Sequence, residues 1–137
     1  MAATITYLTL GATDLEASVA FYDTVLASLG WSRFTSHPGF VGYGADGIET
    51  GQTLWLCEPF DGGLATAGNG VMLAFGAESR AQVEAFHAAA LAAGATCEGP
   101  PGLRPNYTPT WYAAYVRDLT GNKLAVVFDA PHAAAAA

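Results

Sequence analysis

The chain contains an internal duplication. Residues 7–12 read Tyr-Leu-Thr-Leu-Gly-Ala and residues 72–77 read Met-Leu-Ala-Phe-Gly-Ala, an offset of 65 residues. The pairs Phe21/Phe86 and Leu26/Leu91 keep the same offset. A half of about 65 residues, with one helix on a small sheet, would not readily close a core alone. We therefore predict two modules whose sheets join edge to edge into one curved sheet with a concave face.

The first half of the chain predicts one strand, one helix and three further strands. A strand is expected at 4–10, and a helix begins at the capping box Thr13-x-x-Glu16 and stops at Gly30. Three short strands are expected at 31–35, 40–44 and 52–58, because β-branched and aromatic residues there are separated by turn residues. The order of this half is βαβββ.

The second half predicts the same order. A strand at 70–76 precedes a helix that Ser79-x-x-Gln82 caps and Gly94 ends. Strands are then expected at 95–98, 110–117 and 123–129, and the Pro/Gly-rich segment 99–109 is expected to be a loop. The predicted fold class is α+β: two tandem βαβββ modules form a curved mixed sheet around a concave cavity, with the helices on its outer face.

Length and composition predict a single domain. The chain has 137 residues, and we place the modules at about 4–60 and 68–129, with a tail at 130–137. Hydrophobic residues make up 52% and charged residues 12%, which argues against disorder, and no apolar stretch is long enough to cross a bilayer. Without a signal-like N-terminus, a cytoplasmic location is expected and no membrane partner is predicted.

The charge balance disfavours nucleic acid as a partner. Five basic residues face twelve acidic ones, which gives a formal net charge of −7. That field repels a phosphate backbone and favours cationic ligands, although many acidic proteins are simply soluble. No phosphate-loop spacing is present, so no nucleotide cofactor is indicated.

Several motifs resemble the vicinal oxygen chelate superfamily, which groups glyoxalase I, extradiol dioxygenases and bleomycin resistance proteins. They are Thr-Leu-Gly-Ala-Thr-Asp-Leu-Glu-Ala-Ser at 9–18, Phe21-Tyr22, and Asp118-x-x-Gly121-Asn122 before the last strand. The resemblance covers residues 4–129, and segments 104–107 and 112–118 are similar to a bacterial glyoxalase-like branch. It implies a homodimer, with modules exchanged or sheets completed across subunits. It does not fix an activity, because this fold hosts lyases, isomerases, dioxygenases and binding proteins.

The resemblance also indicates where a divalent metal is held in the metal-dependent members. The matching positions carry Tyr7, Trp55, Met72 and Ala125. Hard divalent cations need carboxylate oxygen or imidazole nitrogen, and these four residues offer at most one phenol. We therefore expect no metal at these positions and no cofactor.

Aromatic and cationic residues are the candidates for ligand binding. If the four positions face the cavity, their side chains form an apolar floor that suits flat or cationic ligands, or they merely fill a redundant cavity. Alternation puts Trp111 and Tyr115 on one face of their strand, and which face is concave stays open. Arg104 is either a clamp for a ligand anion or a solvated loop residue. The predicted ligand-binding residues are Tyr7, Trp55, Met72, Arg104, Tyr107, Trp111, Tyr115 and Ala125.

Two main function hypotheses follow. The first is a metal-free protein that sequesters a small aromatic or cationic molecule. The second is a glyoxalase-like lyase or isomerase, which uses acid–base chemistry on Tyr7, Glu58 or Arg104, or a metal held by other residues. Glu58 is otherwise a solvated loop carboxylate. A vestigial or partner-binding scaffold is the third reading, and whether any reaction is catalysed stays open.

Other polar residues have structural explanations. Cys57 and Cys97 are expected to be reduced and buried, because their spacing fits neither a metal motif nor a disulfide framework. His87 is expected on the exposed side of its helix, near Glu84. Arg117, in a strand interior, is expected to pair with Asp118, Asp129 or a bound anion.

Overall fold

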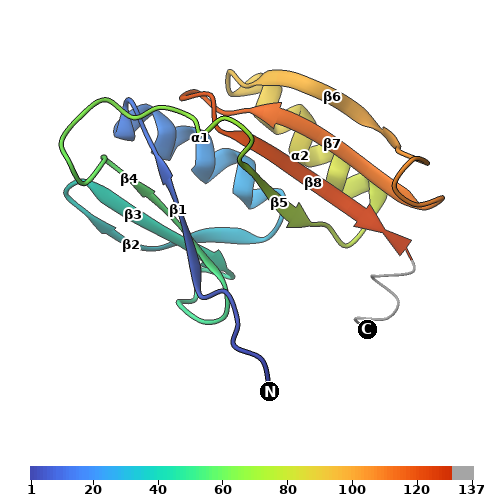
Figure 1. Cartoon of the computed structure of the whole chain (residues 1–137), viewed down its shortest axis with the longest axis horizontal. Coiled ribbons are helices and arrows are strands. Elements are labelled where there is room, and N and C mark those ends of the chain that lie inside the picture. The colour runs from blue at the N-terminus through green and yellow to red at the C-terminus, as the bar shows by residue number, and fades with distance from the viewer. Residues whose placement is uncertain (131–137) are drawn as a thin grey trace.

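The computed structural model describes residues 1–130, so the predicted tail from 131 onward lies outside the described residues. The elements follow the predicted order twice (Figure 1). The first module contains β1 (Tyr7–Gly11), α1 (Leu15–Ala27), β2 (Trp31–His37), β3 (Phe40–Ala45) and β4 (Thr53–Cys57). The second contains β5 (Met72–Gly76), α2 (Arg80–Ala92), β6 (Thr96–Leu103), β7 (Trp111–Arg117) and β8 (Lys123–Asp129). The α+β fold with two βαβββ modules is confirmed.

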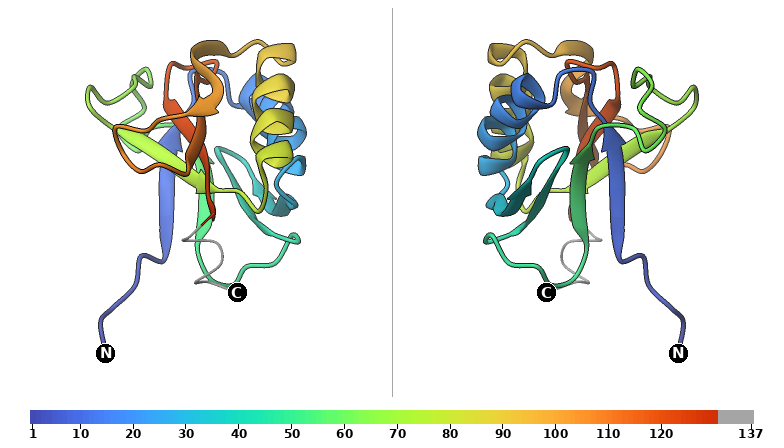
Figure 2. Two further views of the ribbon diagram at one scale, coloured as in Figure 1. Left: turned by 90° about the vertical axis from the view of Figure 1, so that its right-hand side faces the viewer. Right: turned by 90° about the vertical axis from the view of Figure 1, so that its left-hand side faces the viewer.

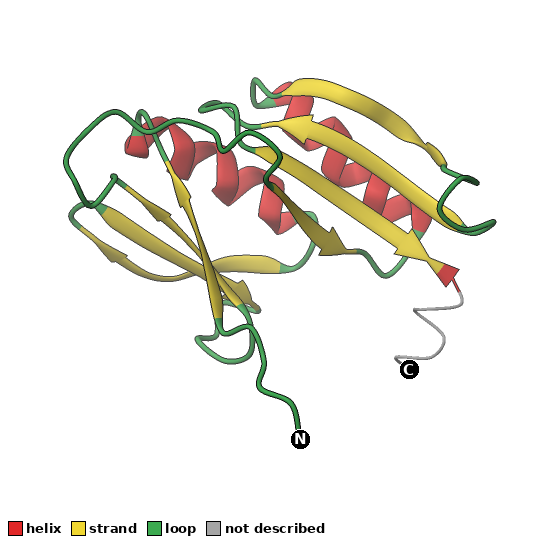
Figure 3. Ribbon diagram, in the orientation of Figure 1, coloured by secondary structure: helices red, strands yellow, loops and turns green. Residues whose placement is uncertain are grey.

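The strands form two four-stranded mixed sheets, with the orders β1-β4-β3-β2 and β5-β8-β7-β6. In each module the first strand runs parallel to the last, and the duplicated segments occupy equivalent places: Tyr7 is opposite Thr53, and Met72 is opposite Lys123. The two sheets lie side by side (Figure 3). In residues 1–130, hydrogen-bonded strand pairs occur within each module and not between them, so the curved surface is made of two sheets.

Both helices lie on the same side of the sheets (Figure 2). Leu54 and Leu56 of β4 and Val116 of β7 belong to the core cluster with helix residues, whereas alternate residues on these strands point to the opposite, open face. Both modules therefore present one face that no helix covers. Within residues 1–130, no helix has the length and apolar composition needed to span a membrane.

One core serves both modules. Phe21 and Phe86, which keep the 65-residue offset, are both buried. The ring of Trp31 from the first module lies 5.7 Å from that of Phe75 in the second, and Phe75 lies 5.9 Å from Phe86. The repeat is imperfect at its other pair, because Leu26 is buried whereas its counterpart Leu91 is 40% exposed.

The turn at 118–122 also ties the modules together. The Asp118 side chain, only 7% exposed, accepts a 2.6 Å hydrogen bond from the Tyr22 hydroxyl of α1. It also accepts hydrogen bonds from three backbone N–H groups of its own turn, at 120, 121 and 122. The Asn122 amide donates both to Asp118 and to the Gly11 carbonyl at the end of β1. This turn is therefore a polar link between the two modules.

That link explains why one predicted helix cap is wrong. Asp14, not Thr13, is the N-cap of α1, and its carboxylate accepts from the Ala17 backbone N–H at 3.0 Å. Thr13 instead donates its backbone N–H to the Thr120 hydroxyl of the linking turn, at 3.1 Å. In the second module the predicted cap is confirmed, because the Ser79 hydroxyl accepts from Gln82 N–H.

Strand β6 extends into the segment predicted to be a loop. It runs through Pro100 and Pro101 to Leu103, with register shifts against β7. Prolines are tolerated there because β6 is an edge strand and need not donate on its free side. The Arg104 guanidinium stabilises the segment by donating to the carbonyls of Pro100, at 2.7 Å, and Gly102, at 2.8 Å.

Three polar residues differ from expectation. Arg117 pairs with Glu98, at 2.8 Å, rather than with Asp118 or Asp129, because β6 runs beside β7. Cys97 is exposed rather than buried. His87 is buried rather than exposed, because α2 packs against β6, and its Nε2 lies 3.2 Å from Cys97 Sγ. Burial lowers the pKa of His87.

Candidate functional site

The open face of the first sheet carries an aromatic cluster around Trp55. The parallel register sets Thr9 beside Trp55 and Gly11 beside Cys57, so alternate residues of β1 and β4 share one face. Tyr7, Thr9, Trp55 and Cys57 line a hollow of about 620 Å³ on that face. Tyr7 and Trp55, both predicted as ligand-binding residues, are therefore brought together.

Neighbouring rings hold Trp55 in place. Its indole lies edge-on to Phe34, with ring centroids 5.4 Å apart, and tilted against Phe40 at 5.8 Å. The His37 ring stacks on Phe40, with ring centroids 4.7 Å apart. Gly42, opposite Trp55 in the β3–β4 register, leaves room for this arrangement, because a Cβ there would meet Phe34 at 2.7 Å and the indole at 3.0 Å. The result is a preformed aromatic surface.

The charge at this hollow is negative. Among the described residues that line it, Glu49 alone carries a formal charge. A second hollow of about 600 Å³ shares Thr9, Phe40 and Cys57 with the first and is lined by two more acids, Glu58 and Asp61. The aromatic surface therefore lies in an acidic part of an acidic molecule.

Cys57 lines both hollows, so the rate at which its thiol is alkylated can be used to probe them. Burial raises the pKa of its thiol, whereas Cys97 is exposed on the edge strand of the other sheet. Alkylation requires the thiolate, so we predict that iodoacetamide modifies Cys97 about tenfold or more faster than Cys57 near neutral pH. Timed quenching and peptide mass spectrometry measure both rates in one sample. Equal rates in the folded protein would contradict the prediction, and the rates should converge in urea.

The open face of the second sheet carries a different hollow. It measures about 560 Å³ and contains five of the predicted ligand-binding residues: Met72, Arg104, Tyr107, Trp111 and Tyr115. Trp111 and Tyr115 therefore lie on the open face of β7, and Tyr112, Ala114 and Val116 pack toward the helices. Ala125, opposite Tyr115, is fully buried beneath these side chains.

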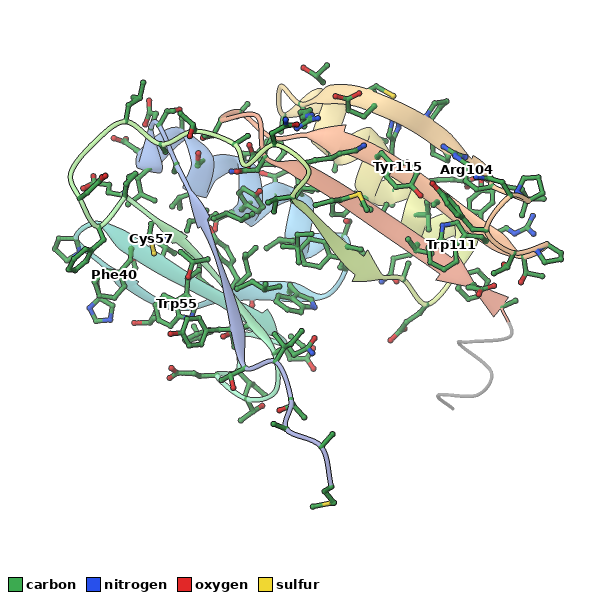
Figure 4. All side chains as sticks on the ribbon, in the orientation of Figure 1. Phe40, Trp55, Cys57, Arg104, Trp111 and Tyr115 are labelled. Atoms are coloured by element: carbon green, nitrogen blue, oxygen red, sulfur yellow. The ribbon has the colours of Figure 1, made fainter. Side chains whose placement is uncertain are left out.

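The predicted binding residues thus form two groups rather than one. Figure 4 shows Phe40, Trp55 and Cys57 on one sheet and Arg104, Trp111 and Tyr115 on the other. Sequence reasoning did not include Phe40, Glu49 and Cys57 in the first group, or Lys123 in the second. The alternation Thr53, Trp55, Cys57 along one strand was a usable signal for Cys57, whereas the Glu49 loop carried none.

The four positions that the sequence resemblance matches to metal ligands carry no carboxylate or imidazole, the groups that a hard divalent ion prefers. Tyr7 and Trp55 lie on the first sheet, and Met72 and Ala125 on the second, so the four offer one phenol and one thioether among aromatic and aliphatic carbon. In residues 1–130, no group of three or more His, Cys, Asp or Glu side chains is placed to hold a metal ion.

The weaker catalytic candidates lie apart. Tyr7 lines the hollow over β1 and β4, whereas Glu58 lines the adjoining one with Phe60 and Asp61. Arg104 is committed to two backbone carbonyls of its own segment. The geometry therefore brings no pair of these groups together over a single reacting atom.

One family model and several solved structures match most of the chain. The family model described as "Glyoxalase/Bleomycin resistance protein/Dioxygenase superfamily" matches residues 4–126. A crystal structure of a glyoxalase/bleomycin resistance protein from Albidiferax ferrireducens is 37% identical, with a TM-score of 0.78, and the match covers 90% of this chain and 97% of that one. No curated protein matches this chain significantly.

Two further structures carry enzyme names. A glyoxalase-related enzyme from Fulvimarina pelagi is 25% identical over 91% of this chain and 87% of that one, with a TM-score of 0.71. A lactoylglutathione lyase from Agrobacterium tumefaciens is 26% identical over 93% of this chain and 94% of that one, with a TM-score of 0.64.

Proposed function

We propose that this chain, which belongs to the Glyoxalase/Bleomycin resistance protein/Dioxygenase superfamily, binds a small planar cation, without a metal, in the hollow over β1 and β4. The observation that carries this proposal is the aromatic surface of Trp55, Phe40 and Tyr7 with Glu49 as the charge beside it. The ligand would be held and released unchanged.

The chemistry of the hollow favours a cation over a neutral ring. An aromatic face attracts a positive charge through its quadrupole, by about 0.5–2 kcal/mol for each well-placed contact. Trp55 is already fixed by Phe34 and Phe40, so little side-chain freedom is lost on binding. Glu49, together with the net charge of −7, adds a long-range attraction for cations.

Three probes that share a naphthyl ring test the charge preference. They are naphthylmethyl trimethylammonium, naphthalenemethanol and naphthoate, which are positive, neutral and negative, and calorimetric titration gives each affinity. We predict that Glu49→Gln lowers the affinity for the cationic probe about three- to tenfold and leaves the affinity for the neutral probe unchanged. Asp46→Asn, which removes an equal charge from a turn residue outside the lining, should have little effect. Equal weakening by both variants would contradict a local role for Glu49.

Protection of Cys57 locates the bound cation independently. A ligand seated in the hollow should slow alkylation of Cys57 and leave that of Cys97 unchanged, since the two thiols lie on different sheets. Protection of neither thiol at saturating cation would show that any binding occurs elsewhere.

We also propose that the protein is a homodimer, with the second copy covering the open faces. Large apolar side chains are exposed there: Tyr7 by 61%, Met72 by 46% and Phe40 by 40%. Such residues on an uncovered face favour association, and a covering copy would enclose the hollows. Sedimentation equilibrium at micromolar concentration should give the mass of two chains. A single-chain mass at all concentrations would contradict the dimer.

A cytoplasmic location stays a prediction.

A glyoxalase-like lyase or isomerase is the alternative function. The similarity to an enzyme named lactoylglutathione lyase supports it, at 26% identity. Turnover of a glutathione–aldehyde adduct by the metal-free protein, abolished in Tyr7→Phe or Glu58→Gln, would favour this alternative over simple binding.

A further inference from the structure

We propose that Cys97 is a site of reversible modification by small disulfides, with His87 as the base that accepts the thiol proton. The two side chains meet between α2 and β6, and neither lines one of the hollows described above. The inference does not rest on the proposed binding of a cation.

The strand register places the Cys97 side chain on the helix side of the second sheet. Cys97 is opposite Val116 of β7, and opposite residues in a ladder point to the same face. Val116 is fully buried in the core that lies against the helices. Cys97 is nevertheless exposed, because β6 is the edge strand of its sheet (Figure 1). A reagent in solution can therefore reach this sulfur without opening the core.

His87 approaches the thiol from inside the protein. Its side chain on α2 is only 9% exposed, and its Nε2 lies 3.2 Å from Cys97 Sγ, within hydrogen-bond distance for sulfur. Burial lowers the pKa of His87, so the ring is mainly neutral near pH 7. A neutral imidazole nitrogen can accept a proton from a thiol. A buried base directed at an exposed thiol is an arrangement that activates a cysteine for nucleophilic attack.

The charged and titratable side chains of the elements that pack against His87 are engaged elsewhere. Burial is the cause of the lowered pKa of His87, and no neighbouring carboxylate opposes it. The Tyr112 hydroxyl donates to Glu84 under Arg80, Glu98 pairs with Arg117, Lys123 faces Tyr115, Asp129 accepts from Thr108 and Thr110, Tyr22 donates to Asp118, Asp23 pairs with Arg33, and Glu16 is exposed. Within residues 1–130, the hydrogen-bond partner of the His87 ring is therefore the Cys97 thiol.

The reaction is thiol–disulfide exchange. The Cys97 thiol gives its proton to His87 Nε2, and the sulfur attacks one sulfur of the small disulfide. A new S–S bond forms to Cys97 and the original S–S bond breaks. The Cys97 sulfur is oxidised, and the departing sulfur is reduced, leaves as a thiolate and takes the proton from His87. The disulfide comes from outside the chain, because the other cysteine, Cys57, lies on the first sheet.

Peptide mass spectrometry after timed exposure to bis(2-hydroxyethyl) disulfide, an uncharged probe, tests the site. Near pH 7 we expect Cys97 to form the mixed disulfide about tenfold or more faster than Cys57, and a free thiol should remove it. His87→Gln, which cannot take up the proton, should slow the reaction of Cys97 about three- to tenfold. His37→Gln is the matched control, because His37 lies on the first sheet, and it should change that rate less than twofold.

The pH dependence distinguishes proton acceptance from packing. A cysteine thiol is ionised without a base at about pH 10, so His87→Gln and the wild type should then react at the same rate. The wild type gives the same test alone: relative to a free cysteine peptide, Cys97 should react about threefold or more faster at pH 7 and no faster at pH 10. The rate at Cys57 in the same samples shows whether each variant is folded, because unfolding would expose that thiol.

Several outcomes would overturn the proposal. They are the absence of a mixed disulfide at Cys97, equal rates at Cys97 and Cys57 in the folded wild type, and equal effects of the two histidine variants. A ratio between wild type and His87→Gln that is the same at both pH values would show that His87 acts only through packing.

Discussion

Replacing Asp118 with alanine is expected to lower the free energy of unfolding by about 3–5 kcal/mol, the largest effect on stability that we predict. The buried carboxylate accepts hydrogen bonds from the Tyr22 hydroxyl, the Asn122 amide and three backbone N–H groups. Alanine would leave these donors without their acceptor inside the protein. Thermal unfolding should show a fall in Tm of about 10 °C or more.

Two further variants distinguish the loss of the polar link at the turn 118–122 from the loss of a surface charge. Tyr22→Phe removes only the donor on α1, and we expect a loss of about 1–2 kcal/mol. Burial and Asp118 raise the pKa of Tyr22 well above its ordinary value, so its hydroxyl is protonated and can donate to Asp118 near neutral pH. Asp61→Ala, at an exposed loop residue, should change stability by less than about 0.5 kcal/mol. A loss below 1 kcal/mol for Asp118→Ala would contradict the role assigned to this turn.

Replacing Trp55 with leucine is expected to lower the affinity for the naphthylmethyl cation about 30-fold or more, the largest effect on binding that we predict. Leucine keeps an apolar side chain on β4 but removes the ring that Phe34 and Phe40 hold in position. Both the stacking surface and the cation–π contact are lost. Calorimetric titration of the wild type and the variant measures the change.

Trp111→Leu is the matched control, because Trp111 lies on the other sheet and lines the other hollow. It should change affinity for the cation less than twofold, and both variants should unfold cooperatively near the wild-type Tm. Unchanged cation affinity in Trp55→Leu would mean that the aromatic surface on β4 is not the binding site.

The modules could be predicted from sequence because their signals are local and repeated. The stop of α2 at Gly94 needs only the left-handed φ of +106° that this residue adopts directly after the C-cap, Ala93. The predicted stop of α1 at Gly30 is a little late, because α1 ends at Ala27 with Ser28 as its C-cap. The Ser79 cap likewise acts within one turn of its helix. The Thr13 cap failed because Thr13 contacts a turn more than 100 residues away, which no local pattern records.

The site could be predicted only in part, because it depends on contacts between strands that are distant in the sequence. Trp55 and Tyr7 were identified through the resemblance, but Phe40 meets Trp55 only because of the antiparallel register that sets Gly42 opposite Trp55. The division of the predicted residues into two hollows depends on the two sheets forming separately, and pattern alone predicted a joined sheet. Arg104 was expected either to clamp a ligand anion or to be solvated, but its guanidinium donates to two carbonyls of the bulged strand β6.

The indole N–H signals of the three tryptophans provide the most direct test of the proposed cation site. Trp55 lines the first hollow, Trp111 lines the second, and Trp31 packs against Phe75 in the core. In a heteronuclear NMR titration with naphthylmethyl trimethylammonium, we predict that the Trp55 signal moves saturably while those of Trp31 and Trp111 stay in place. A stationary Trp55 signal at saturating cation, or equal movement of all three, would contradict the account.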